Sequence, residues 1–309
     1  MEKAIHEFVE SYETPDGVTL DFTETEFCQC TWVQIQNENG AAIMERAIGN
    51  YVTIETDIMY RGKTGELDEI AKIVSEYLTR LMGISDISDD ASVLVVGIGN
   101  RNVIADSLGV RTADKVVATR HAVSEVKNYQ GEPIRSISVI SPGVMGVTGI
   151  STAEIIKSIC GVINPSLVIL IDALAARETT RLCSTIQLSD AGIVPAAGVT
   201  GKANKQEINS DYLRIPTVSI GIPTVVNAAT IMTDFMSLLA QEHSDDEELG
   251  ESMIKCIHQY AEDLFLTSSP FVATKEIDAA INYSAYVLST AINMALFGED
   301  WVQMPHNTY

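Results

Sequence analysis

The chain has 309 residues, of which 46% are hydrophobic and 20% charged, so it is long enough to bury one large core or two modest ones. Its net charge of −22 repels phosphate backbones and argues against direct binding to nucleic acid. The longest apolar runs are too short to span a membrane, and the first residues lack the basic-then-apolar pattern of a secretion signal. Cys28 and Cys30 lie one residue apart, which fits reduced thiols of a cytoplasmic protein better than a redox or zinc motif.

Residues 1–90 are expected to form an N-terminal α+β region. Alternation of polar and apolar residues predicts strands within 17–27 and 50–56. Apolar positions three and four apart predict an amphipathic helix over 66–83 that ends in a glycine.

A polar connection at 84–92 is the preferred boundary with a second region, 91–309, where strand and helix patterns alternate. Four short apolar runs without alternation are typical of parallel strands that are buried on both faces: 92–99, 136–141, 166–172 and 217–222. The pattern predicts an α/β fold with three layers, a mostly parallel sheet flanked by helices.

Local signals set the expected limits of the later elements. Ser151 and Glu154 match a capping box, which predicts a helix that begins at Ser151. The acidic stretch 240–252 predicts a solvated loop. A long last helix is expected to begin at Thr274, as its N-cap, and to stop at Gly298.

The stretch VLVVGIGNRNVIADSLG, residues 93–109, is a strand-type run that breaks into a glycine turn. Gly97 and Gly99 match part of a dinucleotide fingerprint, but Asn102 occupies the third glycine position. No acid that could bind a ribose follows about twenty residues further on. The glycines therefore indicate a tight turn and not a nucleotide site.

Two aspartates stand where predicted strands end. Asp106 follows the first of these strands by a short loop, and Asp172 ends another directly. Because the carboxyl ends of parallel strands meet at one edge of a sheet, the pattern sends both carboxylates to the same edge. One carboxylate of such a pair could activate water while the other, protonated, polarises a scissile carbonyl. The pattern equally allows Asp172 to be a helix cap or a partner of Arg177.

A glycine-rich turn precedes the helix expected at Ser151. Gly143, Gly146 and Gly149 could expose backbone N–H groups to a phosphate or a developing oxyanion, although no lysine of a Walker loop follows. They could also simply let the chain pass close to a neighbour. Motifs of serine hydrolases, zinc peptidases and pepsin-type enzymes are absent from the sequence.

Six motifs, in this order, resemble those of the germination proteases of spore-forming bacteria. They are GIGNRNVIADSLG (97–109), ATRH (118–121), SPGVMGVTGI (141–150), IDALAAR (171–177), TIQLSDAGIVPAAGV (185–199) and IGIPTVVNAATI (220–231). The resemblance implies an aspartic-type endopeptidase that degrades small acid-soluble spore proteins in the cytoplasm of the forespore or spore core. It also implies a zymogen that trims itself, a homotetramer, and a fold similar to that of the hydrogenase maturation proteases.

Position by position, the two essential aspartates of that family fall on Asp106 and Asp172. In the related maturation proteases a glutamate that directly follows the first aspartate helps to bind nickel. Ser107 stands there in this chain, so the resemblance favours catalysis without a metal or another cofactor.

The sequence departs from the family pattern in the N-terminal segment that is removed. The family's Arg-Thr-Asp-Leu-Ala stretch is replaced by TLDFTETEF, residues 19–27, and we expect self-processing there and a propeptide of about 1–26. A cut could follow the aspartate, or fall within the acidic-then-apolar Thr-Glu-Phe stretch. The residues concerned are Asp21, Phe22, Glu26 and Phe27.

A second departure is Asn227, where the family usually has an aspartate. It could weaken the site or merely change a hydrogen bond. Two alternatives therefore stay open: a diverged peptidase that clips a single partner protein, and a descendant that binds spore proteins without cleaving them.

Overall fold

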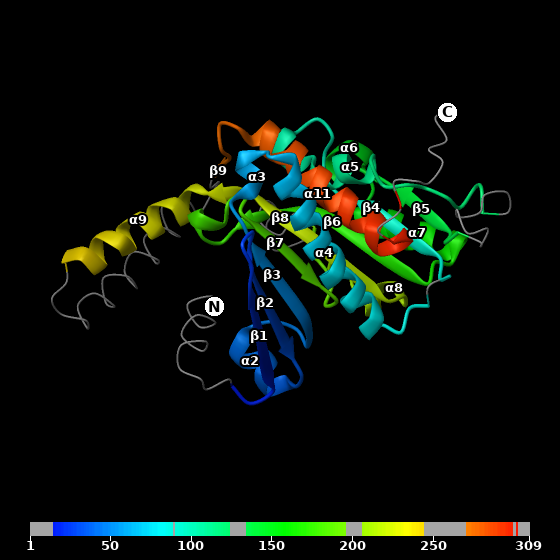
Figure 1. Cartoon of the computed structure of the whole chain (residues 1–309), viewed down its shortest axis with the longest axis horizontal. Coiled ribbons are helices and arrows are strands. Elements are labelled where there is room, and N and C mark those ends of the chain that lie inside the picture. Colours follow the sequence, from blue (N-terminus) through cyan, green and yellow to red (C-terminus); the bar gives the residue numbers. More distant parts are fainter. Residues whose placement is uncertain are drawn as a thin grey trace.

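The computed structural model describes residues 15–88, 90–123, 134–195, 206–243, 270–298 and 301. One sheet forms the centre of this part of the chain, with the strand order β1-β2-β3-β7-β8-β6-β4-β5 and with β9 paired to β8 (Figure 1). The strands are β1 (Val18–Glu24), β2 (Gln29–Ile35), β3 (Gly49–Glu55), β4 (Val93–Gly97), β5 (Ile137–Ile140), β6 (Leu167–Ala176), β7 (Thr185–Ser189), β8 (Thr217–Asn227) and β9 (Phe271–Val272). The helices are α2 (Glu38–Met44), α3 (Ile58–Arg61), α4 (Thr64–Ile84), η1 (Ile104–Asp106), α5 (Leu108–Ala113), α6 (Met145–Thr148), α7 (Thr152–Ile163), η2 (Thr179–Arg181), α8 (Ser210–Leu213), α9 (Ala228–His243) and α11 (Ile277–Phe297).

The strands β8, β6, β4 and β5 run parallel and are covered on both faces. Val93 and Val95 of β4 pack in one core with side chains of α4 and α11, whereas Leu94 and Val96 face α7 on the other side. Because each face of such a strand is buried, neither needs polar residues, which explains the continuous apolar runs. The predicted α/β class, a sheet between two layers of helices, is confirmed.

The N-terminal strands extend this sheet as an antiparallel arm. β1, β2 and β3 pair in succession, β3 pairs with β7, and β7 is antiparallel to β8 (Figure 1). The predicted strands at 17–27 and 50–56 are β1 and β3, and the predicted helix at 66–83 is α4. Strands from both sides of the 84–92 connection therefore belong to one sheet, and the core that contains Trp32 also contains Val218.

One predicted helix start is confirmed and another is wrong. Ser151 is the N-cap of α7, as predicted, but its side chain makes no capping hydrogen bond, so the capping box is not formed. Instead, the neighbouring Thr152 hydroxyl donates to the Gly143 carbonyl (3.1 Å). α11 begins at Ile277, and Thr274 contributes only its backbone carbonyl, which accepts from the Ile277 N–H (3.2 Å). The last helix therefore begins three residues later than Thr274, which the sequence predicts as its N-cap.

The end of α9 corrects another expectation. This helix continues through residues 240–243, the beginning of the predicted acidic loop, and projects away from the sheet (Figure 1). The remainder of that stretch, 244–252, lies outside the described residues. Gly298 caps α11 at its C-terminal end, as predicted. Across the described segments, no helix has the length and apolar character needed to cross a membrane.

Candidate active site

Asp106 lies on a tight turn at the carboxyl end of β4. Gly99 adopts a φ of +128°, and a Cβ atom there would lie 2.0 Å from the Asp106 carbonyl oxygen. The Asn100 N–H donates both to that carbonyl oxygen (3.0 Å) and to Oδ2 of the Asp106 side chain (2.9 Å). Gly99 therefore allows the backbone of Asp106 to come close to it, and the turn holds one oxygen of the Asp106 carboxylate in place.

Asp172 lies within β6, next to the end of β4. The Ile98 N–H donates to the Ile171 carbonyl (2.8 Å), so the turn after β4 begins beside the peptide that precedes Asp172. The Asp172 side chain is only 3% exposed, and its Oδ1 accepts from the Ala173 N–H (2.9 Å). The structure thus brings both predicted aspartates to one edge of the parallel strands.

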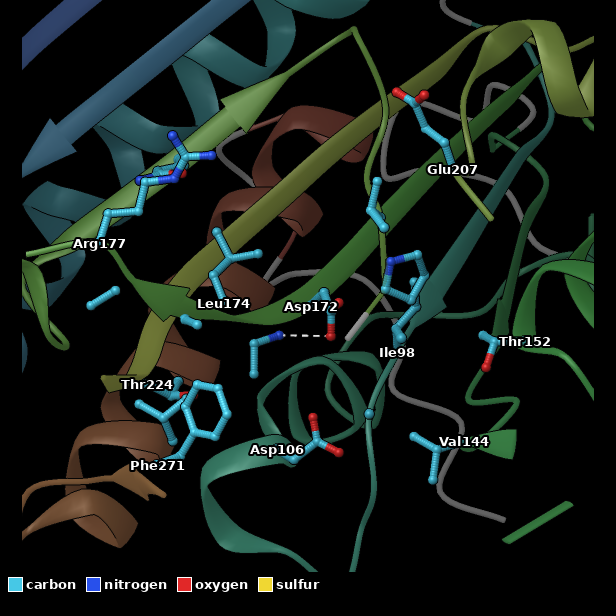
Figure 2. Close-up of a pocket in the computed structure, with 18 of the residues that line it drawn as sticks. Ile98, Asp106, Val144, Thr152, Asp172, Leu174, Arg177, Glu207, Thr224 and Phe271 are labelled. Carbon is cyan, nitrogen blue, oxygen red and sulfur yellow. Dashed lines mark hydrogen bonds between the residues drawn. The ribbon is translucent and has the colours of Figure 1, made fainter. Parts of the chain in front are cut away.

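The two carboxyl groups face each other across a short gap (Figure 2). Burial raises the pKa of Asp172, and the nearby charge of Asp106 raises it further, to about 8. Burial also raises the pKa of Asp106 above its usual range, against the effect of the Asn100 N–H. Arg177, a possible partner of Asp172, is exposed and forms no ion pair with it. Asp106 and Asp172 therefore lie close to each other, and Arg177 does not neutralise Asp172.

Both aspartates line a cleft of about 1940 Å³. Its walls come from the ends of β6 and β8, the segment around α6, the start of α9, and Phe271 (Figure 2). Among the described residues, the acidic side chains that join the pair in lining it are Glu45, Glu154, Glu207 and Asp234, and the basic ones are Arg46 and Arg177.

The predicted glycine turn forms one wall of this cleft. Gly146 and Gly149 line it, and Gly143 lies in the same segment with a φ of +77°. A Cβ atom at Gly146 or Gly149 would meet nothing within 4 Å, so close approach to a neighbour does not explain these two glycines. The Gly149 N–H donates to the Met145 carbonyl (2.8 Å) and is therefore already engaged.

Residues of the expected processing segment lie away from the aspartates. Asp21 and Phe22 belong to β1, opposite Trp32 and Thr31, and the acidic-then-apolar pair follows in the turn to β2. β1 is five strands from β6 in the sheet order, which corresponds to roughly 24 Å at the usual strand spacing.

Thr224 is a cleft residue that the sequence analysis did not identify. It lies in β8, and its hydroxyl donates to the Ala105 carbonyl (2.6 Å), directly before Asp106. Asn227 is not among the residues that line the cleft; its Oδ1 accepts from the Ala229 N–H (2.8 Å) at the start of α9. An aspartate at position 227 could accept the same hydrogen bond.

Ser107, the position that bears on metal binding, is fully buried, and its hydroxyl donates to the Ile104 carbonyl (2.7 Å). Within the part of the chain that the structure describes, no three His, Cys, Asp or Glu side chains are grouped so that they could hold a metal ion.

Comparison with known proteins identifies the relatives of this chain. The germination protease family model matches residues 1–268. A germination protease of Clostridium tetani is 36% identical over 310 residues, which cover 95% of this chain and 92% of the relative. One from Caldanaerobacter subterraneus subsp. tengcongensis is 37% identical over 290 residues, covering 91% and 88%. Among solved structures, a NiFe hydrogenase maturation protease from Thermococcus kodakarensis aligns with 15% identity and a TM-score of 0.30, over 59% of this chain and 97% of that one.

These relatives define the protein as a peptidase, and its buried Asp172 and half-buried Asp106 lie in an open cleft. The match over most of its length goes further: the chain belongs to the germination protease family, as its six motifs predicted.

Proposed function

We propose that the protein is an aspartic-type endopeptidase that begins the degradation of small acid-soluble spore proteins during germination. The observation that carries this proposal is the pair Asp106 and Asp172, which face each other in a cleft of about 1940 Å³ (Figure 2). Membership of the germination protease family supports the class of substrate. It also supports a homotetramer that acts in the cytoplasm of the forespore or spore core.

We propose different roles for the two carboxyl groups, because their environments differ. With a pKa of about 8, Asp172 keeps its proton at neutral pH, and the Ala173 N–H on Oδ1 leaves Oδ2 to carry it. Asp106 has no comparable burial and serves as the ionised partner. Two carboxyl groups whose pKa values are pushed apart are suited to act as base and acid in one reaction.

In the first step, the Asp106 carboxylate removes a proton from a water molecule, and the water oxygen attacks the scissile carbonyl carbon. The Asp172 proton passes to the carbonyl oxygen, which gives a neutral gem-diol. In the second step, Asp106 returns its proton to the amide nitrogen as the carbon–nitrogen bond breaks. One gem-diol hydroxyl gives its proton to Asp172, so that both carboxyl groups return to their starting states. The segment with Gly143, Gly146 and Gly149 serves in this scheme as a wall of the substrate cleft.

We also propose that the protein is made as a zymogen and cuts itself within residues 19–27. Among the residues that the structure describes, β1 has a neighbouring strand on one side only, and the turn at Glu26 and Phe27 connects it to β2. Because β1 lies five strands from β6, this segment has to leave β2 before it can reach the aspartates. An edge strand is the part of a sheet that can detach with the fewest broken hydrogen bonds.

The decisive experiment is a mass-spectrometric digest of a small acid-soluble spore protein by the wild type, Asp106→Asn and Asp172→Asn. An Asp211→Asn variant, altered at an exposed aspartate outside the cleft and beyond the expected propeptide, is the matched control. Each protein is first held at mildly acidic pH to allow self-processing.

We expect defined cleavage by the wild type and the control, and a loss of at least about a thousandfold in both cleft variants. Cleavage that survives both cleft substitutions would refute the acid pair while keeping the family assignment. No cleavage by the wild type would favour a peptidase for a single partner, or a binder of spore proteins.

A further inference from the structure

β8 contains a bulge beside the aspartate pair. Along β6 and β8 the register runs Leu174 opposite Pro223 and then Ala175 opposite Val225, so Thr224 has no partner in β6. The Pro223 carbonyl is held by the Cys183 N–H (2.7 Å), which leaves the next residue to turn independently of the ladder. Bulges recur next to active sites, where they redirect a side chain.

The redirected side chain is that of Thr224. It is 1% exposed, and its hydroxyl donates to the Ala105 carbonyl at 2.6 Å, a short hydrogen bond between residues 119 positions apart. That carbonyl belongs to the peptide unit that leads into Asp106. Figure 2 shows Thr224 on one side of Asp106, with Asp172 across the gap. This hydrogen bond connects β8 to η1, the short helix that contains Asp106.

We infer that Thr224 is a positioning residue, whose hydroxyl fixes the Ala105–Asp106 peptide and so aims the Asp106 carboxylate at Asp172. Two hydrogen bonds then act on the turn from different sides: Asn100 N–H holds the carboxylate oxygen, and Thr224 holds the peptide before it. The inference rests on the proposed function, in which the two carboxyl groups act together on one water molecule.

A loss of this hydroxyl has a specific consequence. Without its donor, the half-buried Ala105 carbonyl turns toward another partner, such as water in the cleft, because an unsatisfied acceptor is costly. Rotation of this peptide swings the Asp106 side chain, and a displacement of about 1 Å from the productive geometry can cost about a hundredfold in rate. Substrate binding along the rest of the cleft is unaffected, so the change falls on kcat and not on KM.

β8 itself provides a matched control. Thr217, at the other end of the strand, is also 1% exposed, and its hydroxyl also donates to a backbone carbonyl, that of Ile215 (2.9 Å). It does not line the cleft. Thr224→Val, Thr224→Ser and Thr217→Val are therefore compared in the self-processed protein, with thermal unfolding to confirm that each is folded.

For Thr224→Val we expect kcat to fall by about tenfold or more with KM within about twofold. Thr224→Ser keeps the hydroxyl and should recover most of the rate, and Thr217→Val should match the wild type. Unchanged kcat in Thr224→Val, or an equal loss in Thr224→Ser, would overturn the inference.

A second readout does not require turnover. Titration of the Asp106 carboxyl carbon by NMR reports its surroundings directly, and a carboxylate that swings toward water should titrate at least roughly half a pH unit lower. We expect this shift in Thr224→Val and not in Thr224→Ser or Thr217→Val. If Asp106→Asn proves fully active, the proposed function fails, and the titration still decides whether Thr224 positions Asp106; no shift in Thr224→Val overturns that role.

Discussion

At the scale of single residues, the burial of Asp172 links the proposed chemistry to stability. Its pKa of about 8 in the folded protein lies far above the value of about 3.9 expected in the unfolded chain. Between these two pH values folding takes up a proton, so the free energy of unfolding falls as pH rises. Asp172→Asn removes the titrating group with little change of shape. We therefore predict that the free energy of unfolding of the variant, relative to that of the wild type, rises by a few kcal/mol between about pH 4 and pH 8. The expected size is roughly 1.4 kcal/mol per unit of pKa shift.

Urea unfolding of the two proteins at several pH values measures this difference. Asp211→Asn, at an exposed position outside the cleft, is the control for the loss of one carboxyl group. The stability that protonated Asp172 contributes to the wild type is fully present below its unfolded pKa and is lost as pH rises through its folded pKa. A difference in the free energy of unfolding that shrinks toward pH 8 would therefore contradict the assignment of the proton to Asp172.

At the scale of elements, the turn between β4 and α5 depends on Gly99. An alanine there would have an unfavourable φ of +128° and a Cβ atom 2.0 Å from the Asp106 carbonyl oxygen. We predict that Gly99→Ala lowers the free energy of unfolding by about 2 kcal/mol or more and lowers peptidase activity by at least about a hundredfold. Gly161 in α7 is the matched control, since a Cβ atom there meets nothing within 4 Å.

Gly161→Ala should leave activity unchanged and stabilise the protein by up to about 1 kcal/mol, because alanine is the better helix former. Thermal unfolding and the spore-protein digest measure both effects. Equal behaviour of the two alanine variants would mean that the turn can shift without moving Asp106.

How far the sequence predicts these elements depends on the range of the forces that form them. β4 and β6 could be predicted because burial on both faces leaves continuous apolar runs, and the convergence of Asp106 and Asp172 follows from the parallel geometry alone. The bulge at Thr224 could not, because it exists only in the register between β6 and β8. At α7 the sequence predicts the N-cap Ser151 but not the hydrogen bond from Thr152 to Gly143, because the two residues are nine positions apart.

At the scale of the whole molecule, charge and strand order act together on self-processing. The chain carries 42 acidic and 20 basic residues. The segment that we expect to be cut contains Asp21, Glu24 and Glu26, and the cleft that has to receive it is itself lined by acidic side chains. At neutral pH, mutual repulsion therefore opposes the approach of the detached segment to the aspartates.

Two independent changes relieve this repulsion, and both should accelerate processing. Lowering the pH from 7 toward 5 protonates part of the carboxyl groups, and the rate should rise several-fold until Asp106 is itself protonated. Raising the salt concentration to about 1 M at pH 7 shortens the screening length to about 3 Å and should reproduce part of the gain without any change in protonation. The measurement is the mass of the chain against time, with Asp106→Asn as the variant that should stay intact throughout. Acceleration by acid but not by salt would mean that the titration of one group, and not the overall charge, controls processing. Equal rates at pH 7, at lower pH and at high salt would exclude both explanations.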